Sequence, residues 1–119
     1  MNAFIITNSK NEILFQKFQA QASDELYLAM LTQVKQSEYL DASAQTEVNT
    51  QFSIFTQKSI YNHRFFYSCH QDDISLSKQC IDLWLDYCKN PLTNICSSNE
   101  QEKNIYISMY ENQISDKFK

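Results

Sequence analysis

The adjacent residues Cys69 and His70 are of the types that carry out nucleophilic catalysis, in which an imidazole activates a thiol. The residues from Arg64 to Cys69 are mostly apolar and aromatic, a composition typical of a β-strand. Because successive side chains of a strand point to opposite faces, the thiol and the imidazole should point apart. His63 is a more distant candidate base. We therefore expect no catalytic residues, and an enzyme is the least favoured function class.

The four cysteines, Cys69, Cys80, Cys88 and Cys96, are candidate metal ligands together with His70. Structural zinc sites pair their ligands about two to four residues apart, and these residues lack that spacing, so we expect no metal site. All four cysteines lie in the second half of the chain, two of them on inward faces of a predicted helix. This arrangement favours buried, reduced thiols over disulfides, as in a cytoplasmic protein.

The composition argues against several other function classes. The chain has no glycine, so it has no glycine-rich loop for a phosphate, and we expect no cofactor. Its net charge is −4 and Arg64 is its single arginine, which argues against nucleic acid as a ligand. No apolar segment approaches the roughly 20 residues that cross a bilayer, and the N-terminus does not resemble a signal peptide. The 119 residues suit one domain, 1–119, in the cytoplasm.

Four apolar segments are predicted to be strands. Residues 3–6 and 13–18 flank the polar cluster 8–12, so they predict two strands joined by a tight loop. Residues 52–56 alternate between apolar and polar types, and residues 64–69 predict the next strand.

A first helix is predicted between these two pairs of strands. Ser23 is a suitable N-cap, and apolar residues follow at helical spacing. These residues are Leu26, Tyr27, Met30, Leu31 and Val34. Residues 37–50 are mostly polar, and they predict a loop or an extension of the helix.

A second helix, from about 75 to 89, is apolar around an unusually wide arc. Its apolar residues span roughly 200°, about twice what a surface helix needs. They are Leu76, Cys80, Ile81, Leu83, Trp84, Leu85, Tyr87 and Cys88. We expect one side of the helix to cover the sheet of its own domain and the other side to face a partner protein. Asn90-Pro91 should end the helix, because proline disfavours helical geometry in the preceding residue.

The C-terminal segment has a weaker pattern. Ser98 and Gln101 are spaced as in a capping box, and Tyr106, Met109 and Tyr110 favour a helix, although Tyr106, Ser108 and Tyr110 also alternate as in a strand. We expect a third helix here and a frayed tail from residue 113 onward.

Three segments of the second half resemble one protein family. His63 to Phe66 is a basic and aromatic strand, His70 to Ile74 is an acidic loop, and Cys80 to Leu92 is an apolar helix that ends in Asn-Pro-Leu. Together they resemble the sedlin group of small TRAPP subunits, and the opening hairpin of residues 4–15 is similar as well. The resemblance implies an α+β fold of the longin or SNARE-like type, with an antiparallel sheet of about five strands flanked by two or three helices.

The same resemblance implies a non-catalytic subunit of a TRAPP complex, which tethers vesicles and activates a Rab GTPase in transport between the ER and the Golgi. Its partners would be other small TRAPP-type subunits and, indirectly, the Rab, with peripheral membrane association only through the complex. Large amphipathic side chains concentrate interface energy, so the predicted interface residues are Tyr27, Leu31, Val34, Trp84, Tyr87 and Leu92. Core packing is the alternative role of Trp84 and Tyr87. Another small binding module, such as a small adaptor-complex chain or an unrelated inhibitor-like protein, is the alternative function.

Overall fold

The computed structural model describes residues 1–36, 46–49, 52–58, 63–90 and 99–118. The described strands and helices follow one another in a fixed order along the chain. They are β1 (Ala3–Thr7), β2 (Ile13–Phe18), α1 (Asp24–Gln36), β3 (Thr46–Asn49), β4 (Ile54–Lys58), β5 (Arg64–Ser68), the short 3₁₀ helix η2 (Gln71–Asp73), α2 (Ile74–Lys89), α3 (Glu100–Ile114) and the 3₁₀ helix η3 (Ser115–Phe118).

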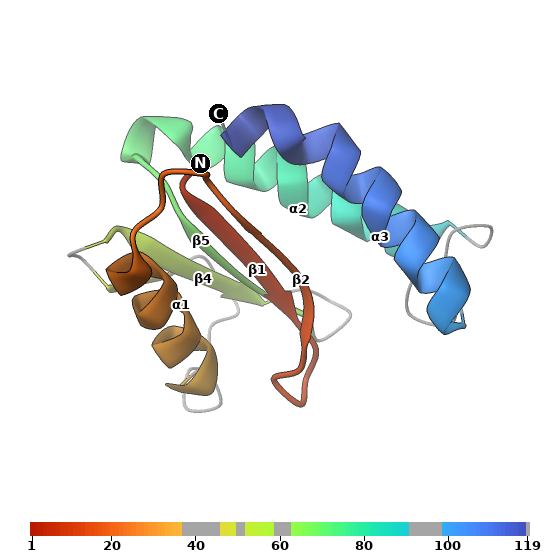
Figure 1. The fold of residues 1–119 in the computed structure, drawn as a ribbon, viewed down its shortest axis with the longest axis horizontal. Helices are drawn as coiled ribbons and strands as arrows, with labels where there is room; N and C mark the ends of the chain where they lie inside the picture. The colour runs from red at the N-terminus through yellow and green to blue at the C-terminus, as the bar shows by residue number, and fades with distance from the viewer. Residues whose placement is uncertain (37–45, 50–51, 59–62, 91–98, 119) are drawn as a thin grey trace.

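The strands form one antiparallel sheet in the order β2-β1-β5-β4-β3. The central strand is β5, in which Phe66 lies opposite Ile5 of β1 on one side and Thr56 of β4 on the other. Helix α1 covers one face of the sheet, and α2 and α3 lie side by side over the other face (Figure 1). The predicted α+β class with an antiparallel sheet is confirmed.

Successive side chains of the strands point to opposite faces of the sheet and form a separate core on each face. In β1, Phe4 and Ile6 face α2, whereas Ala3 and Ile5 face α1. Both faces are apolar because both are covered, and this produces the continuous apolar run at the start of the chain. The core on the α1 side comprises Ala3, Ile5, Leu26, Met30, Val34, Ile54 and Phe66. The larger core on the other side includes Phe4, Phe15, Phe65, Tyr67, Cys80, Trp84, Tyr110 and Ile114.

The structure agrees with most of the predicted helix ends. Ser23 caps α1, because its hydroxyl oxygen accepts a hydrogen bond from the backbone N–H of Leu26 at 3.1 Å. Helix α2 ends at Lys89, and Asn90 has extended backbone angles, as expected before a proline. Asp73 stands at the N-cap of α2, but its side chain accepts no capping hydrogen bond there.

Two predictions of secondary-structure elements were wrong. Residues 37–50 were expected to contain a loop or a helix extension, yet Thr46–Asn49 forms strand β3, which pairs with β4 at the edge of the sheet. The N-cap of α3 is Asn99 rather than Ser98: its side-chain oxygen accepts from the backbone N–H of Glu102 at 2.9 Å. Ser98 itself lies outside the described residues.

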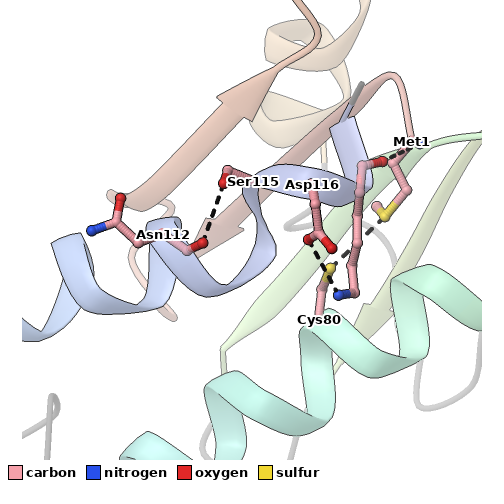
Figure 2. A network of polar contacts seen from close by, with 6 residues as sticks. Met1, Cys80, Asn112, Ser115 and Asp116 are labelled. Carbon is pink, nitrogen blue, oxygen red and sulfur yellow. Dashed lines mark hydrogen bonds and ion pairs between the residues drawn. The ribbon is translucent and has the colours of Figure 1, made fainter.

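The segment expected to fray is packed instead. Phe118 of η3 is only 4% exposed, and the terminal amino group of Met1 donates to the carbonyl oxygen of Lys117 at 2.7 Å. Figure 2 shows this end of the molecule, where Met1 Sδ also lies 3.9 Å from Cys80 Sγ of α2. Ile114 and Phe118 of the tail join the core on the α2 side of the sheet, a contact that local sequence does not reveal.

Candidate functional site

The structure separates the residues that the sequence offered for catalysis. Cys69 directly follows β5, and its side chain lies in the core on the α2 side, whereas the neighbouring His70 is exposed. His63 precedes β5, so about 20 Å of extended chain separates it from Cys69. Burial raises the pKa of the Cys69 thiol, which opposes formation of the nucleophilic thiolate. These three residues therefore do not form a nucleophile with its base.

A buried hydrogen bond joins the start of β5 to α2. Trp84 Nε1 donates to His63 Nδ1 at 3.0 Å, and the two side chains are 0% and 7% exposed. A ring nitrogen that accepts a hydrogen bond carries no proton, so this contact requires the neutral imidazole. Burial acts in the same direction, because it lowers the pKa of His63 below its usual range. The pair is a structural link between sheet and helix.

We expect this link to make the stability of the fold depend on pH. Because the folded-state pKa of His63 is lowered, its contribution is fully present above the unfolded-state value of about 6.5 and is lost as the pH falls below that value. Urea unfolding at about pH 7.5 and about pH 5 should therefore show a lower free energy of unfolding at the acidic end.

Two variants isolate the imidazole of His63. In His63→Gln the side-chain oxygen can still accept from Trp84 but does not titrate, so the part of the pH dependence that arises from His63 should disappear. The exposed His70 is a matched control, and His70→Gln should keep the wild-type dependence. Equal pH dependence in all three proteins would contradict the assignment.

The described cysteines are buried, as the sequence predicted. They are Cys69, Cys80 and Cys88, while Cys96 lies outside the described residues. Burial raises the pKa of Cys80 to about 11, so its thiol stays protonated and unreactive near neutral pH. Within the described ranges, no three histidine, cysteine or acidic side chains gather in a group that could hold a metal ion.

The structure corrects the prediction that Trp84 faces a partner. Trp84 is 0% exposed, and its ring packs against Tyr110 of α3 at a centroid distance of 5.1 Å. Tyr87 is 8% exposed, and its ring lies 6.0 Å from the same tyrosine. The wide apolar arc of α2 is thus covered by the sheet on one side and by α3 of the same chain on the other.

The predicted interface residues of α1 lie on the opposite face of the sheet from α2, so the two helices cannot flank one contact (Figure 1). Val34 is 4% exposed and belongs to the α1 core. Tyr27 is 40% exposed and Leu31 is half-buried, so these two remain available to a partner. Leu92 lies outside the described residues.

The sequence analysis missed the most exposed large apolar side chain among the described residues, Leu28, which is 62% exposed. The sequence indicated this exposure through the position of Leu28 on the helix, because Leu28 lies off the apolar stripe formed by Leu26, Met30 and Val34. Helix α3 presents a second pair, Ile105 and Met109, which are 58% and 45% exposed. Exposed apolar residues thus gather on the outer faces of both helical layers.

One hollow, with a volume of about 460 Å³, lies between α2 and strands β4 and β5. Its charged residues, Lys78 and Asp82, are exposed and lie one turn apart on α2, a spacing typical of a solvated pair on a helix surface. Its buried hydroxyl, Ser77 Oγ, donates to the backbone carbonyl of Ile74. These groups do not combine a nucleophile with a base.

Comparison with known proteins leaves the family open: the chain matches no protein-family model and no curated protein. Among the described helices, none has the length and apolar character needed to cross a membrane.

Proposed function

We propose that this chain is a non-catalytic assembly module of the longin-like type, and specifically a small subunit of a TRAPP-type vesicle-tethering complex. Its immediate partners would be other small subunits, and its link to a Rab GTPase and to ER or Golgi membranes would be indirect. The alternative is another longin-like module, such as a small adaptor-complex chain.

The layered architecture is the observation that carries the proposal. One antiparallel sheet has helix α1 on one face and the pair α2 and α3 on the other, which is compatible with a longin-like fold. Such a fold leaves the outer faces of its helices for partners. Leu28 on α1 and Ile105 on α3 are exposed on these outer faces, and the candidate catalytic residues Cys69 and His63 are buried in separate places.

Co-purification of the full-length tagged chain with mass spectrometry tests the proposal. We expect other small α+β subunits to be recovered in stoichiometric amounts. Because charge at the centre of an interface is strongly unfavourable, Ile105→Asp on α3 should reduce this recovery at least about tenfold while the circular dichroism spectrum stays unchanged.

The exposed polar residue Asn104 of α3 provides a matched control, and Asn104→Asp should leave the recovery unchanged. Recovery of large adaptor chains instead would favour the alternative function. Absence of any stoichiometric partner, or full recovery with Ile105→Asp, would overturn the proposal.

A further inference from the structure

The outer face of α1 carries charge of opposite sign at its two ends and apolar residues between them. Asp24 lies in the first turn and Lys35 in the last turn. Leu28 lies between them, and Leu31 adjoins it on the same side of the helix. At 100° per residue, all four side chains fall within about 60° of one direction, which points away from the buried stripe of the helix.

This pattern is complementary to itself when the helix is reversed. If two copies of α1 pair in antiparallel orientation about a twofold axis, position 24 of one copy meets position 35 of the other, and position 28 meets position 31. All of these positions lie on the side of each helix that faces the other copy, as the twofold axis requires. Each copy would thus place an acidic residue against a lysine at both ends and leucine against leucine in the middle.

We propose that the occupant of the outer α1 face is a second copy of this chain, bound as such an antiparallel pair. The inference rests on the proposed function, because it names the partner of one face of an assembly module. It places Leu28 at the centre of the contact and Lys35 of each copy beside Asp24 of the other.

A hollow at the start of α1 supports the position of the lysine. It has a volume of about 200 Å³ and is lined by residues that include Phe18, Asp24 and Tyr27. The rings of Phe18 and Tyr27 lie 5.1 Å apart between centroids, and Asp24 lines the same hollow. A carboxylate next to aromatic rings suits the end of a lysine side chain, whose apolar stem packs on the rings while its ammonium group stays near the acid.

The surface area buried in the contact indicates the affinity of the dimer. A helix of 13 residues is about 20 Å long, so the paired helices bury less than the roughly 800 Å² per partner of a standard interface. The association is therefore weak and depends on protein concentration, and its ion pairs make it weaker at high salt.

Sedimentation velocity of the purified full-length chain over a wide range of concentration tests the proposal. We expect a reversible monomer–dimer equilibrium. Two single variants, Asp24→Lys and Lys35→Asp, should each weaken self-association at least about tenfold, because each places like charges together at both ends of the contact. An equimolar mixture of the two variants should associate again, because every end then pairs opposite charges.

Two further variants separate this contact from others. Leu28→Asp should abolish the dimer without unfolding the protein, since Leu28 is 62% exposed, whereas Ile105→Asp on α3 should leave the dimer intact. A chain that stays monomeric at all concentrations, a dimer that persists in Leu28→Asp, or a mixture of charge variants that does not associate would each overturn the inference. None of these results would affect the recovery of other subunits, which tests the proposed function separately.

Discussion

Trp84→Ala is expected to lower the free energy of unfolding by about 3–5 kcal/mol, a large fraction of the stability of a domain this size. Trp84 is completely buried, and its ring contacts Phe15 of β2, Tyr110 of α3 and His63. Removing the indole leaves a cavity where the sheet and both helices of this face meet. It also removes the hydrogen bond to His63. Urea unfolding followed by far-UV circular dichroism measures the loss.

Trp84→Phe is the control for this substitution, because it keeps an aromatic ring but removes the hydrogen-bond donor. It should cost about 1–3 kcal/mol, less than the alanine variant. If Trp84→Ala left the stability unchanged and only weakened binding to other proteins, Trp84 would be an interface residue, as first expected from the sequence, and its placement in the core would be wrong.

Tyr110→Ala is expected to destabilise the protein by a similar amount, about 3–5 kcal/mol, and to loosen α3. Tyr110 is 0% exposed, and its ring lies 5.0 Å from that of Phe15 between centroids. Its hydroxyl donates to the backbone carbonyl of Cys80 at 2.7 Å, and burial raises its pKa, so it remains a donor. Besides Tyr110, the buried residues of α3 and η3 are Ile114 and Phe118. Native-state hydrogen exchange should therefore show faster exchange along α3.

Tyr110→Phe separates the hydroxyl from the ring. It should cost only about 1 kcal/mol, because it removes one hydrogen bond and preserves the packing. Met109 is 45% exposed, so Met109→Ala is the matched control for an exposed apolar position on α3. Tyr106 would be a poor control, since it is half-buried and packs partly on the same core. Slow exchange along α3 in Tyr110→Ala would show that other contacts hold the helix.

Local sequence was sufficient to predict several elements. The strands at 3–6 and 13–18 were predicted because apolar runs flank a polar turn, and in that turn Asn11 adopts a positive φ of 63° in place of glycine. Helix α1 was predicted from a serine cap and a regular apolar stripe, and α2 from its apolar spacing and the Asn90-Pro91 stop. Strand β3 was missed because Thr46–Asn49 is a short polar segment whose backbone pairs with β4, and such pairing leaves little trace in hydrophobic pattern.

The sequence by itself determined that the chain forms an α+β domain, that α2 is buried over a wide arc, and that the described cysteines lie in the core. Only the tertiary structure decided what covers that arc. Local patterning shows how much of a helix is apolar, but it does not distinguish another protein from a distant segment of the same chain. In the folded chain Tyr110 of α3 packs against Trp84, whereas α1 lies on the other face of the sheet. Burial depends on which distant segments meet in three dimensions, so the covering of Trp84 by α3 could be recognised only in the folded chain.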